Sequence, residues 1–175
     1  MQPEEIPAVV KRLRRAPLLP AGSGTAVSFD STAVERLIPH RDPLRLVDAI
    51  DAVDVVARAV RGRRRLSELD PVFAGHFPDQ PVYPGVLVVE AIGQLALTLI
   101  HFSRGATTLP APGTKLKVRA TRIHHAVFFA PFAPGDTMVL HAQVLENDLC
   151  LTAVGQAYNG DTLAACAISE VYLDD

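Results

Sequence analysis

The spacing of hydrophobic and polar residues changes along the chain and predicts different elements in its two halves. A short helix is expected over residues 31–37, where Ser31 or Thr32 can cap the first turn and Pro39 prevents continuation. Residues 44–62 are rich in valine and alanine and partly alternate with polar residues, which is typical of β-strands. The first half is therefore expected to contribute one helix followed by strands.

Strand-like runs dominate the second half of the chain. They cover residues 115–129, 137–146, 149–158 and 162–173, after a loop over residues 103–114 that is rich in glycine, proline and threonine. Short hairpin signals, Asn147-Asp148 and Asn159-Gly160-Asp161, separate the last three runs. This order predicts an antiparallel meander.

Between the two halves, one long helix is predicted to begin at Pro84-Gly85. Its residues as far as Phe102 are apolar on nearly every side, as expected of a helix that is buried by a sheet. The polar residues fall on one narrow stripe, formed by Glu90, Gln94, Thr98 and His101. A buried helix with a polar stripe indicates a site of chemistry.

The first 30 residues differ from the rest of the chain. Several prolines interrupt the short helical pattern around VKRLRR, and Gly22-Ser23-Gly24 is typical of a flexible joint. We therefore expect residues 1–30 to form a loosely ordered N-terminal extension and residues 31–175 to form a single domain.

Composition limits the class of protein without identifying it. The chain has 175 residues, of which 49% are hydrophobic and 21% are charged, which suits one packed domain. A formal net charge of -2 gives no electrostatic footprint for nucleic-acid binding. The 2 cysteines have no metal-ligand spacing and fit a reducing compartment. No secretory signal is recognisable, and the polar residues within 86–102 make a poor membrane span, so we expect a cytoplasmic protein without membrane contact.

A candidate proton-transfer site lies in the segment GHFPDQPVYPGVLVVEAIGQ, residues 75–94. Its prolines are expected to hold His76 on rigid backbone. Gly85 opens the long helix, where unpaired backbone N–H groups favour negative charge. Glu90 is expected to be partly desolvated, as suits a proton donor, and Gln94 can orient it from the next turn. Either His76 or Glu90 alone would suit a purely structural role, but their combination favours chemistry.

This segment closely resembles the active-site segment of the FabZ-type 3-hydroxyacyl-acyl-carrier-protein dehydratases, a family with the hotdog fold. LIPHRDPLRLVD at residues 37–48 resembles the N-terminal signature of the same family, and FFAPFAPGD at residues 128–136 resembles its Pro-Gly-Asp turn. The resemblance spans residues 31–173. It implies an α+β hotdog fold, in which an antiparallel sheet wraps around a long central helix, and a homodimer or higher oligomer whose sheets join edge to edge.

The resemblance also implies a reaction and its residues. His76 would be the base and Glu90 the proton donor, contributed by opposite protomers, while Gly85 would bind the thioester carbonyl and Gln94 would support Glu90. The reaction is loss of water from a (3R)-hydroxyacyl thioester, carried on the phosphopantetheine of an acyl carrier protein. The product is a trans-2-enoyl thioester of fatty-acid, polyketide or modified-lipid synthesis. Glutamate rather than aspartate at position 90 implies dehydration without isomerisation.

No cofactor is implied, and no metal site is expected. His124 and His125 are adjacent on a predicted strand, so their side chains would point to opposite faces. Two other functions stay open, because fold alone does not determine chemistry. They are a hotdog acyl thioesterase and a catalytically silent hotdog subunit that binds acyl chains.

One stretch departs from the family pattern. Val127, Phe129 and Ala130 occupy positions where arginine or lysine is common in the family. Recognition of an acidic carrier protein would then depend on cations elsewhere, such as those of the N-terminal extension or of the run from Arg61 to Arg65.

Overall fold

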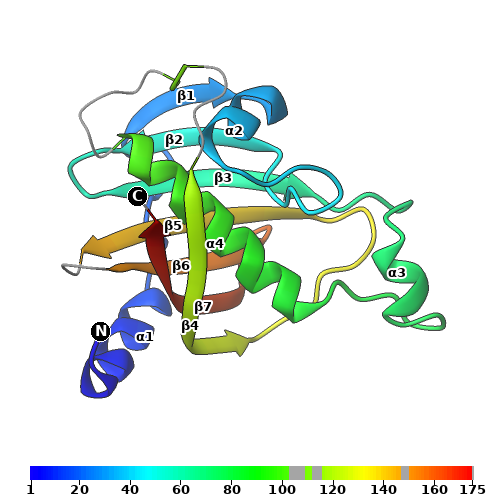
Figure 1. The fold of residues 1–175 in the computed structure, drawn as a ribbon. Helices are drawn as coiled ribbons and strands as arrows, with labels where there is room; N and C mark the ends of the chain where they lie inside the picture. Colours follow the sequence, from blue (N-terminus) through cyan, green and yellow to red (C-terminus); the bar gives the residue numbers. More distant parts are fainter. Residues whose placement is uncertain (103–108, 112–115, 147–149, 175) are drawn as a thin grey trace.

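The computed structural model describes residues 1–102, 109–111, 116–146 and 150–174. Seven antiparallel strands form one curled sheet in the order β1-β2-β3-β5-β6-β7-β4, with a long helix lying against it (Figure 1). The strands are β1 (Thr25–Phe29), β2 (Ala49–Asp54), β3 (Ala59–Arg65), β4 (Lys117–Phe128), β5 (Thr137–Glu146), β6 (Cys150–Asn159) and β7 (Thr162–Asp174). The helices are η1 (Pro3–Glu5), α1 (Ile6–Leu13), α2 (Ser31–Leu37), α3 (Val72–Gly75) and α4 (Gly85–Phe102). This is the predicted hotdog fold.

The centre of the core is α4, which packs against β3, β5, β6 and β7. Ile92, Leu95 and Leu99 are each almost completely buried there. Helix and sheet approach closely at Gly155 of β6, where an added Cβ would lie 2.7 Å from the His141 carbonyl oxygen and closer still to the Ile92 side chain. By length and hydropathy, α4 is the one helix among the described residues that could cross a membrane, but here most of it is buried inside the protein.

The structure confirms most of the predicted elements. The long helix begins at Gly85 as expected, and β5, β6 and β7 form the predicted meander with a turn at Gly160. β4 does not join that meander through β5; it pairs with β7 and forms one edge of the sheet. The Asn147-Asp148 turn, the start of the run at residue 115, and most of the loop over residues 103–114 lie outside the described residues.

The capping prediction for the short helix is wrong, although the helix itself is confirmed as α2. Asp30 is the N-cap residue: its backbone is extended, and its Oδ1 accepts a hydrogen bond from the Ala33 N–H at 2.9 Å. An aspartate one position before the helix satisfies a free N–H of the first turn, so Ser31 and Thr32 are left inside the helix.

The N-terminal segment covers the outer face of the sheet, opposite α4 (Figure 1). Leu13 of α1 is fully buried against Val154, Cys166 and Ile168, which point away from α4 because side chains alternate along a strand. The buried Gln156 side chain also accepts from the Leu18 N–H at 2.8 Å and donates to the carbonyls of Leu13 and Ala16. The division of the chain at residue 30 stays a prediction. In the structure, residues 1–30 make these contacts with the sheet and include strand β1.

Candidate active site

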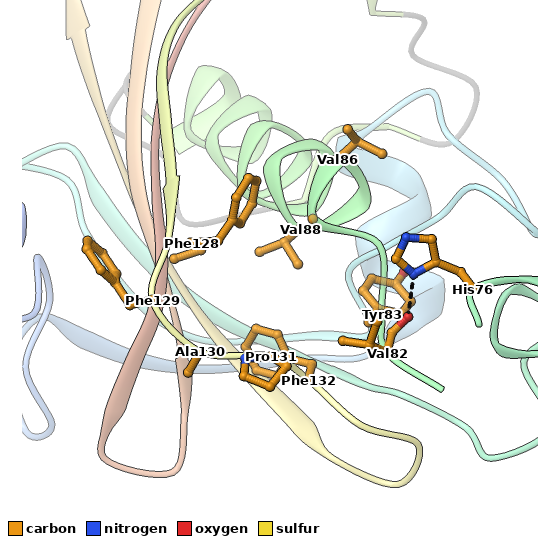
Figure 2. A pocket seen from close by; sticks show the side chains of 12 residues that line it. His76, Val82, Tyr83, Val86, Val88, Phe128, Phe129, Ala130, Pro131 and Phe132 are labelled. Carbon is orange, nitrogen blue, oxygen red and sulfur yellow. Dashed lines mark hydrogen bonds between the residues drawn. The ribbon is translucent and has the colours of Figure 1, made fainter. Parts of the chain in front are cut away.

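His76 is held by backbone hydrogen bonds at the end of α3. Its N–H donates to the Val72 carbonyl at 3.0 Å, and its carbonyl accepts from the Val82 N–H at 2.9 Å. Its ring Nδ1 lies 2.8 Å from the Val82 carbonyl oxygen (Figure 2). Because a carbonyl oxygen only accepts, Nδ1 is the donor of this hydrogen bond, and Nε2 is the ring nitrogen left for another partner. The ring is therefore oriented as a base.

A cavity of about 500 Å³ lies between His76 and the start of α4. Apart from the histidine its lining is mostly apolar, as Figure 2 shows. The lining residues are His76, Val82, Tyr83, Gly85, Val86, Val88, Phe128, Phe129, Ala130, Pro131, Phe132 and Ala165. Such a cavity suits a hydrocarbon chain that reacts next to one polar group.

Gly85 is the residue at which α4 begins, and it lies against the aromatic wall of the cavity. An added Cβ would lie 2.8 Å from two carbons of the Phe128 ring, so glycine lets the aromatic wall contact the helix backbone. The N–H groups of Leu87 and Val88 already donate to the Pro84 carbonyl. Those of Gly85 and Val86 come before these first donors, where a helix has no internal acceptor to offer. A developing negative charge in the cavity can accept from them.

Glu90 and Gln94 lie one turn apart on α4. The Gln94 Nε2 donates to the Glu90 Oε1 at 2.9 Å and to the Leu44 carbonyl at 2.8 Å. The Gln94 Oε1 accepts from the Leu46 N–H at 2.8 Å. Gln94 therefore makes the hydrogen bond through which it could orient the Glu90 carboxylate. The Glu90 side chain is 45% exposed in the single chain, so the predicted desolvation is incomplete without a further covering surface.

The histidine of the IPHRDP segment is a site residue that the sequence reasoning missed. The His40 Nε2 lies 3.4 Å from the Glu90 Oε1, and burial lowers the pKa of His40 although Glu90 opposes that shift. His40 is therefore neutral near pH 7 and can donate from Nε2 to the carboxylate. The signal that could have found it was its place in the quoted N-terminal signature, LIPHRDPLRLVD.

The polar stripe of α4 also has a structural role. Gln94 binds Leu44 and Leu46, and the His101 Nε2 lies 3.0 Å from the Leu37 carbonyl, so two of the four stripe residues tie the segment 37–46 to the helix. Thr98 is fully buried and bonds a carbonyl of its own helix. The Glu90 end of the stripe faces a cavity.

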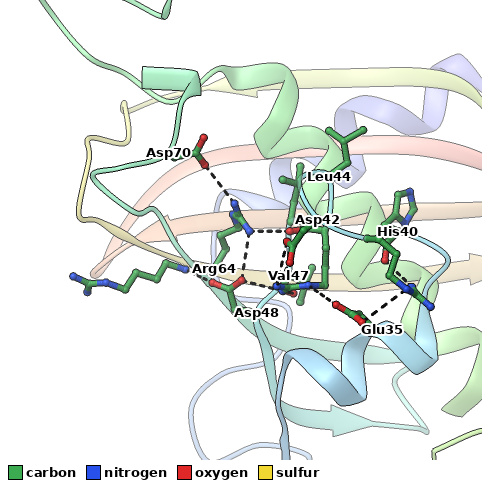
Figure 3. Close-up of polar contacts among 12 residues, drawn as sticks. Glu35, His40, Asp42, Leu44, Val47, Asp48, Arg64 and Asp70 are labelled. Atoms are coloured by element: carbon green, nitrogen blue, oxygen red, sulfur yellow. Dashed lines mark hydrogen bonds and ion pairs between the residues drawn. The ribbon is translucent and has the colours of Figure 1, made fainter. Parts of the chain in front are cut away.

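A network of charged side chains also holds the segment 37–46 in place (Figure 3). The Arg45 side chain is almost buried; it donates to the Val47 carbonyl at 2.8 Å and pairs with Glu35 and Asp48. Arg64 of β3 donates to the Arg45 carbonyl at 2.8 Å. These contacts hold in place the segment that carries His40 and contacts Gln94.

One chain does not bring the two predicted catalytic residues into the same cavity. His76 and Gly85 line the large cavity, whereas Glu90 and Gln94 line a smaller one of about 160 Å³. The smaller cavity is also lined by Val118, Ala120 and Ile123 of the edge strand β4. It therefore borders the edge at which another strand could pair.

The remaining candidates have other partners. The His124 Nε2 lies 3.3 Å from the Glu170 Oε2, and among the described residues no group of histidine, cysteine and carboxylate side chains could hold a metal ion. In the run of arginines, Arg63 pairs with Asp51, and Arg64 is bound within the network of Figure 3. Arg63 and Arg64 are therefore already paired with carboxylates of the same chain.

Comparison with known proteins agrees with this geometry. A family model described as a FabA-like domain matches residues 38–167. A 3-hydroxyacyl-[acyl-carrier-protein] dehydratase FabZ from Rickettsia felis is 40% identical over 116 residues, which cover 66% of this chain and 75% of the relative. The FabZ of a Sulfurovum species is 33% identical over 138 residues, covering 78% of this chain and 91% of the relative.

A solved structure supports the fold independently. A sigma28-regulated virulence protein from Campylobacter jejuni superposes with a TM-score of 0.59 at 14% identity, over 83% of this chain and 91% of its own. At that identity the likeness concerns the fold alone. The family model and the FabZ relatives together show that the chain belongs to the FabA-like family, as the segment around His76 and Glu90 predicted.

Proposed function

We propose that this chain is a hydro-lyase that removes water from (3R)-3-hydroxyacyl thioesters carried on an acyl carrier protein. The observation that carries the proposal is the 2.8 Å contact between the His76 Nδ1 and the Val82 carbonyl oxygen, which leaves Nε2 to act as a base beside an apolar cavity and the start of a helix. A base in such a place suits removal of a proton next to a thioester carbonyl. The named activity of the FabZ relatives supports the same reaction.

The reaction needs a base, an acceptor for negative charge and an acid. The His76 Nε2 takes a proton from C2 of the substrate, and charge develops on the thioester oxygen. The Gly85 N–H at the start of α4 stabilises that oxygen. Glu90 gives a proton to the 3-hydroxyl, so that the C3–O bond breaks, water leaves and a trans C2–C3 double bond forms. The His76 imidazolium then gives up its proton and the Glu90 carboxylate takes one up, either directly or by exchange with solvent, and the site is reset.

We place the complete site at the contact between two copies of the chain. β4 is an edge strand with exposed backbone and an exposed Ile123, and an uncovered edge of this length is a natural pairing surface. The Glu90 cavity borders that edge, so a second copy paired there would cover the half-exposed carboxylate and could bring its own His76 toward it. The protein would then act as a dimer, or as an oligomer of dimers, in the cytoplasm.

The test of the reaction is turnover of a 3-hydroxyacyl thioester, followed through the absorbance of the enoyl product. His76→Ala and Glu90→Gln should each lower kcat by 100-fold or more, an estimate of about 10²–10⁴ for loss of a positioned acid or base. Thr98→Val, on the same stripe of α4, is the control and should keep full turnover. Full activity in either site variant would refute the assignment. Release of free thiol without enoyl product would instead identify a thioesterase, and binding without turnover a silent subunit.

Mixing the two inactive variants tests the shared site. A mixed dimer has one site in which both His76 and Glu90 are intact, so random exchange should restore about a quarter of wild-type activity. Two variants that remain inactive after unfolding and refolding together would show that each chain supplies its own pair.

A further inference from the structure

The N-terminal segment presents a row of cations to solvent. Its hydrophobic residues face the sheet, which leaves Lys11, Arg12, Arg14 and Arg15 exposed on the outer side. We refer to these four residues as the basic arm. None of them is paired with a carboxylate among the residues that the structure describes, whereas Arg45, Arg63 and Arg64 all are. In a chain whose net charge is -2, this is a local concentration of positive charge.

One member of the basic arm contacts the wall of the large cavity. The Arg14 guanidinium carbon lies 5.1 Å from the centre of the Phe129 ring, a distance at which a cation is attracted to an aromatic face. Phe129 also lines the His76 cavity, and Figure 2 shows its side chain on the outer side of that wall. Arg14, one end of the basic arm, therefore lies directly beside the cavity in which the substrate would react.

The remaining cations form a second surface next to Arg14. Lys11, Arg12 and Arg15 line a shallow groove of about 420 Å³ together with Gln143 of β5, whose Oε1 accepts from Arg12 at 2.9 Å. Four cations within five consecutive residues, directed toward two neighbouring surfaces, match an extended anionic surface better than a single phosphate group. The groove is held in place by the three hydrogen bonds of Gln156 and by the one from Leu19 to His141.

We propose that the basic arm is the docking surface for the carboxylate-rich face of the carrier protein that delivers the thioester. The proposal rests on the proposed function for the identity of the partner. It places the recognition residues outside the family match over residues 38–167. It also provides a cation at Phe129, in the stretch where the sequence lacks arginine and lysine. The sequence offered two sources of cations for carrier binding, the N-terminal extension and the run from Arg61 to Arg65. The basic arm is favoured because Arg63 and Arg64 already form ion pairs within the chain.

Direct binding tests the proposal independently of turnover. Binding of an acyl carrier protein that bears a 3-hydroxyacyl chain should weaken about tenfold in Arg14→Glu/Arg15→Glu, and more at low salt than at high salt. Arg65→Glu is the matched control, because it reverses an exposed charge on β3 away from the arm. Arg14→Lys/Arg15→Lys should keep the wild-type affinity. Equal losses in the arm and control variants, or no loss in the arm variant, would overturn the proposal.

Kinetics with three substrates then locate the effect. The arm variant should raise KM for the carrier-linked thioester about tenfold, while kinetics with the N-acetylcysteamine thioester stay within about twofold of wild type. The free phosphopantetheine thioester should also be unaffected; a matching loss there would show that the arm binds the phosphate and would overturn carrier docking. A wild-type protein that binds the carrier but turns over none of the three would refute the proposed reaction and leave the docking surface standing.

A second variant tests the arm without changing its charge. Gln156→Leu removes the hydrogen bonds that hold Leu13, Ala16 and Leu18 on the sheet, so Arg14 loses its fixed place beside Phe129 and the other cations lose their anchor. Carrier binding should weaken as in the arm variant, with N-acetylcysteamine turnover retained. Undiminished carrier binding in a folded Gln156→Leu protein would contradict the proposal.

Discussion

Replacing Gln94 by leucine should damage stability and activity together, because this one side chain connects the core to the site. Leucine has nearly the same volume, so packing is largely kept while three hydrogen bonds are lost. The Leu46 N–H is left without its acceptor in a buried position, which costs about 1–3 kcal/mol. Leu44 is half-exposed, so water can replace the bond to its carbonyl at a cost of about 1 kcal/mol or less.

These contributions predict a loss of about 1–4 kcal/mol in the free energy of unfolding. For a domain of this size that corresponds to a fall of about 2–16 °C in Tm. The activity should fall further than the stability alone would cause, because the Glu90 carboxylate loses its fixed orientation. A displacement of about 1 Å at a reacting group can cost on the order of 10²-fold in rate.

Urea unfolding and steady-state turnover of the same preparations measure both effects. Thr98→Val is the matched control: Thr98 is as buried and lies on the same stripe, but its hydroxyl bonds only the Leu95 carbonyl of its own helix. It should stay within about 1 kcal/mol of wild type and keep its turnover. A Gln94→Leu protein whose unfolding free energy lies within about 0.5 kcal/mol of wild type would refute the reasoning.

Three further predictions concern packing and pH. Gly155→Ala should cost about 3 kcal/mol or more in thermal unfolding, because the new methyl group meets both α4 and a backbone carbonyl of β5; a loss below about 1 kcal/mol would mean that the two can separate. Burial lowers the pKa of His141 to about 4, and its Nδ1 accepts from the Leu19 N–H. The unfolded state therefore binds the extra proton, and stability should fall by about 3 kcal/mol as pH drops from 6.5 toward 4, a slope that His141→Leu should remove. His40→Asn should lower kcat about tenfold and remove an ionisation below pH 6.5 from the kcat profile, whereas an unchanged profile would mean that His40 does not position Glu90.

The periodicity of hydrophobic residues identified the helices and strands well, because in each of them one requirement, burial in the core, sets the sequence pattern. The helix that begins at Gly85 is surrounded by a sheet, so its sequence is apolar on nearly every side. The long strands of the second half alternate or are buried, and the turn at Gly160 separates two of them. The partner of β4 could not be predicted in the same way, because strand pairing across the sheet leaves no local pattern in the sequence.

The site was predictable where residue types are restricted by chemistry and less so where contacts are made at a distance. His76, Gly85, Glu90 and Gln94 were recognised within one continuous segment. His40 was overlooked, since it reaches Glu90 only because the segment 37–46 folds back on α4. The stabilising role of Gln94 was hidden for the same reason: its partners, Leu44 and Leu46, are about 50 residues earlier.

The helix α1 and strand β1 both precede residue 38, where the family match begins, yet both belong to the folded body. The segment that matches the family model is therefore shorter than the folded body that contains it. A chain that lacks residues 1–37 would expose Val154, Cys166 and Ile168 on the outer face of the sheet, where Leu13 now covers them. Such a fragment would present a newly exposed hydrophobic surface. Its tendency to aggregate, compared with that of the full chain, would measure how far the N-terminal segment protects this face of the sheet.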